Sequence, residues 1–480
     1  MSFTDFLSLG PVITLAAAAV ICLLLVAIKR NHRIMYAGAL LAFGMALTAI
    51  VPAVQYIPHT IPPLLVIDEF SLFNTGLILV SGFIILLLSY NYFEEREERK
   101  EEYYLLLLFA TTGALVLVLS RHFMSLFLGL EILSISLYGL IAYLRARERS
   151  DEAGIKYLIL AALSSAFLLF GMALVYAFTG HMDFPGIGEA LRQAGYLPVS
   201  VMAGFAMMLI GIGFKLGIVP FHMWAPDIYE GAPLPVAAFI ATISKGGMLV
   251  LLIRFYEDIH GNDYTMLWWI LAIVAVASMF TGNWLALRQQ NIKRILAYSS
   301  IAHMGYILVA FLSGVQAGLE AISFYLVAYF ITTIGAFGVL IVMSSSIQDA
   351  ETLSDYRSMF WRYPWIATVF TAMLLSLAGI PLTAGFIGKF YIVMAGVNGH
   401  RWFLLFMLVI NSVIGLYYYI RIIAIMFNAP VEGEEVSPIK PALPMAGNVT
   451  LVLLTVLLIG LGIYPTSMMQ LIQQMMKMIV

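Results

Sequence analysis

The sequence predicts an all-α polytopic membrane protein with about fourteen transmembrane helices. Of its 480 residues, 62% are hydrophobic and only 11% are charged, and the mean hydropathy is +0.96. Soluble domains are roughly half apolar and about a quarter charged. The apolar residues also occur in runs of the length that a bilayer requires, about 17–25 residues. These observations exclude a soluble globular protein.

Fourteen candidate spans follow one another along the chain, each bounded by charged residues, glycine or proline. A short surface helix is expected between the sixth and seventh spans, because Phe184-Pro-Gly opens a mixed polar and apolar stretch there. The spans lie near residues 11–28, 34–51, 70–90, 103–119, 123–144, 155–178, 200–218, 233–253, 266–287, 294–314, 318–342, 365–395, 402–427 and 446–466.

The distribution of lysine and arginine predicts the orientation, because cytoplasmic connections carry an excess of these residues. If the amino terminus lies outside the cytoplasm, fifteen basic residues fall on the cytoplasmic side and five on the other side. Both termini are then expected outside. The cytoplasmic set is Lys29, Arg30, Arg33, Arg96, Arg99, Lys100, Arg145, Arg147, Arg149, Arg288, Lys293, Arg294, Arg357, Arg362 and Lys440, against Arg121, Arg192, Arg254, Arg401 and Lys477.

No motif for a redox cofactor or metal occurs in the sequence. The single cysteine, Cys22, lies in the first apolar run, so the chain itself can form neither a disulfide framework nor a cysteine-ligated iron–sulfur cluster. The glycines of Gly211-Ile-Gly-Phe-Lys-Leu-Gly217 follow no strand and indicate close helix packing rather than dinucleotide binding. The first run has no small-residue cleavage site and is expected to be a retained helix.

Two spans are expected to be broken. Pro220 interrupts the end of the seventh span, and Pro381 lies inside the twelfth, next to several glycines. Proline removes a backbone hydrogen bond and clashes with the preceding turn. Non-helical backbone at membrane depth persists only where protein or a wet cavity satisfies it, and paired interruptions in two halves of a chain point to a transport site. Two ordinary proline kinks are the alternative.

Four ionisable residues lie deep within apolar spans: Glu131, Lys215, Lys245 and Lys389. Each costs about 2.5–3.5 kcal/mol to insert. Glu131 is expected to be the counter-charge of a buried lysine, since a pair about 4 Å apart gains roughly 4 kcal/mol at an effective dielectric constant near 20. This gain is comparable with the desolvation cost of the lysine, so forming or breaking the pair can bind or release a proton.

Other polar residues admit two interpretations. Lys156 is either a member of this group or a lysine that reaches the interface, and Arg421, after Tyr417-Tyr-Tyr, is interpreted as an interfacial anchor in an aromatic belt. His222 and His303 are either satisfied core residues or proton relays, because the pKa of histidine lies near neutrality. The charged stretch 94–102 is expected to be a solvated turn.

Four stretches of the sequence resemble the antiporter-like subunits of respiratory complex I and of Mrp-type cation/proton antiporters. They span Leu126–Glu131, Gly213–Pro233, Gln290–Tyr306 and Leu375–Phe390. The lysine at position 389 favours the N type of subunit over the M type, which has a glutamate there, and the lack of a long carboxy-terminal lateral helix argues against the L type.

The resemblance implies a role for each buried group. Glu131 would pair with Lys215. Lys245 would be the connecting lysine of the proton path, and Lys389 would be the lysine nearest the outer exit. Lys156, His222 and His303 would support the relay, and the breaks at Pro220 and Pro381 would belong to two inverted five-helix repeats. The implied organisation is N-terminal helices over 1–102, repeats over 103–253 and 266–427, and a C-terminal helix within 428–480.

The function expected from this resemblance is proton translocation in the membrane arm of a bacterial NADH:quinone oxidoreductase, in the inner membrane. NADH, FMN, iron–sulfur clusters and quinone would be bound by partner subunits, with no cofactor in this chain and no nucleic acid among its partners. One alternative is an Mrp-type sodium/proton antiporter subunit. Another is a membrane scaffold whose charges only hold helices together.

Overall fold

The computed structural model describes residues 2–94, 96, 99–145, 147–345, 348–430 and 445–476. By packing, the chain divides into two compact units. Unit 1 comprises residues 1–86, 99–224 and 243–271, and unit 2 comprises residues 87–98, 225–242 and 272–480. Lys440 and Lys477, which were assigned to opposite sides of the membrane, lie outside the described residues. The four-part organisation with inverted repeats stays a prediction.

The helical membrane fold is confirmed. Within the described part of the chain, thirteen helices are long and apolar enough to cross a membrane. The twelfth expected span, over 365–395, instead forms two shorter apolar helices, Pro364–Ala378 and Ala384–Asn398. This difference is the expected break at Pro381.

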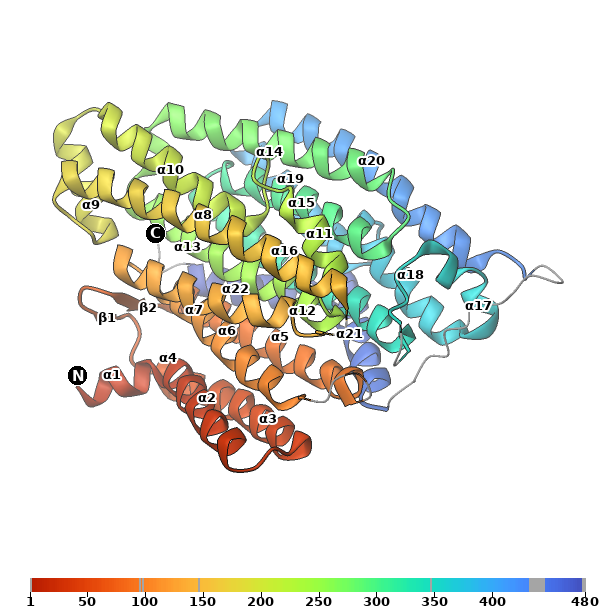
Figure 1. Ribbon diagram of the computed structural model, residues 1–480. Helices are drawn as coiled ribbons and strands as arrows, with labels where there is room; N and C mark the ends of the chain where they lie inside the picture. The colour runs from red at the N-terminus through yellow and green to blue at the C-terminus, as the bar shows by residue number, and fades with distance from the viewer. Residues whose placement is uncertain are drawn as a thin grey trace. The chain divides into compact units, whose positions relative to one another are not determined.

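Unit 1 contains most of the N-terminal half of the chain (Figure 1). Two helices pass from unit 1 into unit 2, namely α5 (Glu69–Glu94) and α14 (Thr265–Ala286). The other elements of unit 1 are α1 (Phe3–Ser8), α2 (Gly10–Ile28), α3 (His32–Thr48), α4 (Ile50–Val54), β1 (His59–Ile61), β2 (Leu65–Ile67), α6 (Glu101–Leu119), α7 (Phe123–Ile141), α8 (Glu148–Thr179), α9 (Phe184–Ala194), α10 (Val199–Leu216), α13 (Lys245–Asp258) and η2 (Gly261–Asp263).

Unit 2 is built around α16 (Val315–Met343), which packs against α15, α18, α19 and α21 (Figure 1). Two elements lie at the division between the units, α11 (Trp224–Gly231) and the π-helical turn η1 (Ile240–Ser244). The remaining elements are α12 (Leu234–Phe239), α15 (Ile292–Phe311), η3 (Leu353–Tyr356), α17 (Met359–Arg362), α18 (Pro364–Ala378), α19 (Ala384–Asn398), α20 (Trp402–Phe427), α21 (Met445–Ile463) and α22 (Thr466–Met476).

The surface helix expected between the sixth and seventh spans is present as α9. Asp183 caps its first turn by accepting a hydrogen bond from the Gly186 amide, and Gly195 ends it in the left-handed conformation. The β1–β2 hairpin was not expected, because its short strands flank Pro62 and Pro63 in a connection that resembles a loop. His59 pairs with Ile67 in its antiparallel register.

Two ion pairs hold the C-terminal end of α13 within unit 1. Arg254 binds the Asp68 carboxylate with two hydrogen bonds of 2.8 and 3.0 Å, and Arg121 binds Asp258 at 2.9 and 3.0 Å. Burial alone would raise the pKa of Asp68, but the charge and hydrogen bonds of Arg254, with those of Ser71, outweigh it and hold this pKa below its usual value.

We expect the stabilising effect of Asp68 to depend on pH. Because the folded pKa is lowered, the contribution is fully present above the unfolded carboxyl pKa of about 4 and is lost as the pH falls through the folded value. Asp68→Asn should therefore lower the thermal midpoint of the purified protein at neutral pH, with a difference from wild type that shrinks on acidification. A difference that grows on acidification would contradict this assignment.

Candidate functional site

The break in the seventh span follows from its sequence. Helix α10 ends at Leu216, and Gly217 adopts a left-handed conformation with a φ of 69°. The Ile218 amide donates to the Gly213 carbonyl at 3.0 Å, which closes the helix end. Pro220, preceded by a cis peptide bond, cannot continue the helix, and α11 begins only at Trp224. The break expected at Pro220 is confirmed.

Lys215 lies one turn before this break, in the interior of unit 1. The residue is 2% exposed, and its amine donates hydrogen bonds to the Ser134 hydroxyl at 2.8 Å and the Tyr157 hydroxyl at 2.9 Å. The Tyr157 ring contacts Phe214 and Trp224, which fixes its orientation. The amine is therefore held at membrane depth by hydroxyl groups, which can also donate or accept a proton.

Glu131 lies on α7, three residues before Ser134 and thus on the same face of the helix. Its carboxylate accepts a hydrogen bond from the Ser165 hydroxyl at 2.8 Å, and it lies close enough to the Lys215 amine for the two groups to interact electrostatically. Among the described residues, no ion pair within 4.0 Å joins the two groups. The structure thus brings the acid and the amine into one cluster without the direct contact that the sequence suggested.

Lys245 and His222 lie near the same break. Lys245 is 1% exposed and opens α13 directly after the π-helical turn η1, a rare element that is frequent at functional sites. Its amine lies beside Gly217, 3.2 Å from the position that a Cβ atom would take there. His222 is buried in the loop after Pro220, within reach of the Lys245 charge. Unit 1 therefore gathers Glu131, Lys215, Lys245 and His222 around the end of α10.

Lys156 lies on an exposed side of α8. Its side chain is 45% exposed on α8 and forms an ion pair with Glu152 at 2.6 Å. The adjacent Tyr157, about 100° further around the helix, contacts Lys215 instead. A role for Lys156 in the relay stays a prediction.

The second break, in unit 2, surrounds Lys389. Helix α18 ends at Ala378, Gly379 has a φ of 85°, and Pro381 precedes the start of α19 at Ala384. The Lys389 amine returns to the end of α18, where it donates to the carbonyls of Leu377 at 3.1 Å and Ala378 at 2.8 Å. It also donates to the Ser412 hydroxyl at 3.0 Å. Lys389 is 8% exposed, so its amine is held in the interior of unit 2.

His303 lies in a hydroxyl-lined interior of unit 2. One ring nitrogen is 2.7 Å from the Tyr325 hydroxyl and the other is 3.2 Å from the Tyr419 hydroxyl, which also bonds Ser299. Tyr419 belongs to the run that was interpreted as an interfacial aromatic belt. That interpretation is wrong for Tyr418 and Tyr419, which are each 1% exposed. A histidine between two hydroxyls has the donors and acceptors of a proton relay.

The interpretation of Arg421 as an interfacial anchor stays a prediction. Its guanidinium donates to the carbonyls of Leu287, at 2.9 Å, and Gln289, just after the end of α14. It therefore satisfies backbone acceptors that a helix end leaves open.

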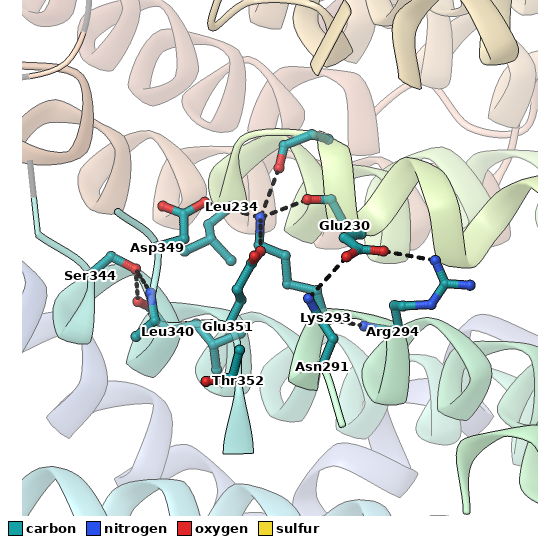
Figure 2. Close-up of polar contacts among 12 residues, drawn as sticks. Glu230, Leu234, Asn291, Lys293, Arg294, Leu340, Ser344, Asp349, Glu351 and Thr352 are labelled. Carbon is teal, nitrogen blue, oxygen red and sulfur yellow. Dashed lines mark hydrogen bonds and ion pairs between the residues drawn. The ribbon is translucent and has the colours of Figure 1, made fainter. Parts of the chain in front are cut away.

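A third cluster, which we call the Asp349 cluster, was not expected from the sequence (Figure 2). Lys293, counted as a loop charge, is 1% exposed; its amine contacts the Asp349 carboxylate at 3.0 Å and the Glu351 carboxylate at 3.5 Å. It also donates to the Glu230 carbonyl at 2.9 Å, near the C-terminal end of α11. Asp349 is shared with Arg96 at 2.6 Å and with the Tyr92 hydroxyl at 3.0 Å.

The Asp349 cluster continues to Arg294, whose guanidinium binds Asp227 at 2.8 Å and Glu230 at 2.7 Å. The cluster therefore links α11, the helix that follows the first break, to the start of α15 and to the end of α5.

The expectation of a solvated turn over 94–102 is wrong for Arg96 and Glu101, whose side chains are buried. The pairs were not foreseen because Asp349 lies 253 residues from Arg96 and 56 from Lys293.

No group of three or more histidine, cysteine, aspartate or glutamate side chains suited to a metal ion is found among the residues that the structure describes. The groups at the two breaks are amines, hydroxyls, an imidazole and a carboxylate. Such groups can bind and release protons.

Comparisons with known proteins show the family of the chain. The family model for the transmembrane region of NADH:quinone oxidoreductase and Mrp antiporter subunits matches residues 120–415, more than half of the chain. NADH-quinone oxidoreductase subunit N of Chromohalobacter salexigens is 46% identical over 467 residues, covering 97% of this chain and 98% of that protein.

Solved structures give the same result. A chain of respiratory complex I from Thermus thermophilus superposes with a TM-score of 0.81 at 30% identity, covering 96% of this chain and 98% of that one. A chain of the Mrp complex from Dietzia sp. superposes with a TM-score of 0.86 at 21% identity, covering 99% of this chain and 97% of that one, a likeness of fold alone. This chain belongs to the family of antiporter-like membrane subunits of NADH:quinone oxidoreductase and Mrp antiporters, and its relatives are of the N type.

Proposed function

We propose that this chain is a proton-translocating membrane-arm subunit of an NADH:quinone oxidoreductase. The observation that carries the proposal is the burial of three lysines, Lys215, Lys245 and Lys389, which are 2%, 1% and 8% exposed at membrane depth. Ionisable groups in such positions are costly and mark ion or proton pathways. The identity of 46% to a subunit N over nearly the whole chain supports the redox complex as its setting.

The proposed step begins at Glu131 and Lys215. At an effective dielectric constant near 20, unit charges about 4 Å apart gain roughly 4 kcal/mol, and at about 8 Å they gain roughly 2 kcal/mol. The difference of about 2 kcal/mol changes the ratio of charged to neutral lysine by about 30-fold. Quinone reduction in a partner subunit would change this separation. Approach of Glu131 would load the Lys215 amine, and withdrawal would release the proton to the hydroxyls that surround it.

The later carriers are Lys245, His303 and Lys389, with Lys389 releasing the proton outward. His222 supports the transfer near the first break, and two inverted repeats over 103–253 and 266–427 would give the breaks equivalent roles. NADH, FMN, iron–sulfur clusters and quinone would be bound by partner subunits. The complex would lie in the bacterial inner membrane, with both termini of this chain on the periplasmic side.

Replacement of Lys215 or Glu131 by alanine tests this function in the assembled complex. Either change is expected to lower the number of protons pumped per NADH oxidised, because the pair can no longer bind and release a proton. Arg192→Ala is the control, since this side chain is 67% exposed on α9 and pairs only at the surface. If both variants assemble and pump like the control, a scaffold role is favoured over transport.

The competing assignment is an Mrp-type sodium/proton antiporter subunit. The fold is compatible with both, and the family model covers both kinds of protein. Purification of the chain from its native membrane separates them: co-purifying flavin and iron–sulfur clusters are expected. Isolation of an intact assembly without them would favour the antiporter.

A further inference from the structure

The two broken spans end their first helices in the same way. Gly217 closes α10 with a φ of 69°, and Gly379 closes α18 with a φ of 85°. In each case the following isoleucine amide reaches back five residues, from Ile218 to Gly213 at 3.0 Å and from Ile380 to Leu375 at 2.9 Å. Glycine is favoured at such positions because other residues rarely adopt a positive φ.

A lysine amine fills the space that a side chain at either glycine would need. A Cβ atom on Gly379 would lie 2.8 Å from Lys389 Cδ and 3.1 Å from its Nζ. A Cβ atom on Gly217 would lie 3.2 Å from Lys245 Nζ. By contrast, Gly180 and Gly195 also have φ values of 70° at helix ends, but a Cβ atom there would meet nothing within 4 Å. The amine contact therefore does not follow from the turn itself.

In unit 2 the amine takes its acceptors from the backbone. Lys389 Nζ donates to the last two carbonyls of α18, those of Leu377 and Ala378, and to Ser412. The C-terminal end of a helix carries a partial negative charge, so it favours an ammonium group. Among the described residues, no carboxylate lies within 4.0 Å of this amine.

The buried Lys293 provides a contrast within the same unit. Its amine also donates to a helix-end carbonyl, that of Glu230, but it has the carboxylates of Asp349 and Glu351 as well. Loss of a proton from Lys293 would remove one of the two cations that pair with Asp349 and the cation that lies beside Glu351. Loss of a proton from Lys389 leaves only neutral carbonyls and a hydroxyl behind, so Lys389 is the lysine suited to change its charge.

We propose that Gly379 is a positioning residue: its lack of a side chain lets the Lys389 amine lie against the C-terminal carbonyls of α18. Gly217 likewise leaves the space that the Lys245 amine occupies beside the end of α10. This inference rests on the proposed proton-transfer function. A methyl group at position 379 forces the flexible lysine side chain to move. The backbone can stay in place while the amine leaves the carbonyls, so the effect falls on proton transfer.

The test compares Gly379→Ala with Gly195→Ala in the holo complex in membrane vesicles. Both replacements put alanine at a positive φ at a helix end, but only the first places a methyl group against a lysine. We expect Gly379→Ala to lower the protons pumped per NADH oxidised to the value of Lys389→Ala, and Gly195→Ala to pump like wild type. The double variant Gly379→Ala/Lys389→Ala should match Lys389→Ala alone.

The outcomes separate this inference from the function on which it rests. If Lys389→Ala is impaired but Gly379→Ala pumps like Gly195→Ala, the positioning role of Gly379 is refuted and the proposed proton-transfer function is retained. If Lys389→Ala pumps normally, both the proposed proton-transfer function and the positioning role of Gly379 are refuted. If Gly379→Ala does not assemble, recovery of assembly in the double variant supports the positioning role of Gly379, because the shorter side chain at position 389 leaves room for the methyl group. Persistent failure in the double variant overturns it.

Discussion

Replacement of Asp349 by alanine is expected to cause the largest loss of stability among single substitutions in this chain. Asp349 is 2% exposed and is shared by Arg96 and Lys293, whose side chains are only 4% and 2% exposed. Removing it leaves two buried cations short of a counter-charge. Breaking a buried ion pair in this way costs about 3–5 kcal/mol, whereas an exposed pair contributes about 0–1 kcal/mol.

The experiment measures assembled subunit and thermal midpoint in the purified complex. Glu189→Ala is the matched control, because it removes a carboxylate from an exposed pair with Arg192 on α9. Adding Lys293→Met to Asp349→Ala should recover part of the lost stability, since it removes one of the two buried cations that Asp349 would otherwise pair with. If Asp349→Ala is no more destabilising than Glu189→Ala, the Asp349 cluster does not hold α11 as we describe.

Replacement of Lys245 by arginine is expected to abolish proton transfer through this chain while leaving its fold intact. Arginine keeps the positive charge but does not release a proton at accessible pH, whereas a buried lysine can. Loss of a group that transfers protons lowers the rate by about 100- to 10,000-fold. A lysine that only balances charge would be replaced by arginine with little effect.

The measurement is proton uptake by vesicles that contain the assembled complex with Lys245→Arg or Lys245→Met. Both variants should lose proton uptake to the same extent, although arginine retains the positive charge and methionine removes it. Assembly should be close to wild type for Lys245→Met, because an apolar side chain of similar length fits the buried site beside Gly217. Normal pumping by the arginine variant would mean that Lys245 supplies charge and not protons.

The sequence predicted those features that depend on local chemistry. Glycine and proline act within a few residues of themselves, so the breaks at Pro220 and Pro381 were correctly placed. The apolar runs predicted the span positions, and Phe184-Pro-Gly favoured the surface helix α9. Each of these signals is complete within one window of the chain.

Features that depend on tertiary packing were missed. Asp349 meets Arg96 and Lys293 across long stretches of sequence, so no local pattern identifies them as buried partners. Lys156 and Tyr157 are adjacent, yet only Tyr157 faces Lys215, because a helix that is apolar on every side does not indicate which face is buried. The run at Tyr417-Tyr-Tyr resembled an interfacial belt for the same reason.

The Asp349 cluster and the lysines at the breaks also differ in what they can do. Lys293 is held by carboxylates, whereas Lys215 and Lys389 are held by hydroxyls and backbone carbonyls. The first arrangement stabilises a fixed charge, and the second tolerates both protonation states. We therefore propose that Lys293 has a structural role and that Lys215 and Lys389 transfer protons, although all three are buried lysines.

The number of protons pumped per NADH oxidised, measured in vesicles of the assembled complex, tests this distinction most directly. We predict that methionine at position 215, 245 or 389 lowers this ratio while NADH oxidation continues. An unchanged ratio in all three variants would contradict the claim that these amines carry protons.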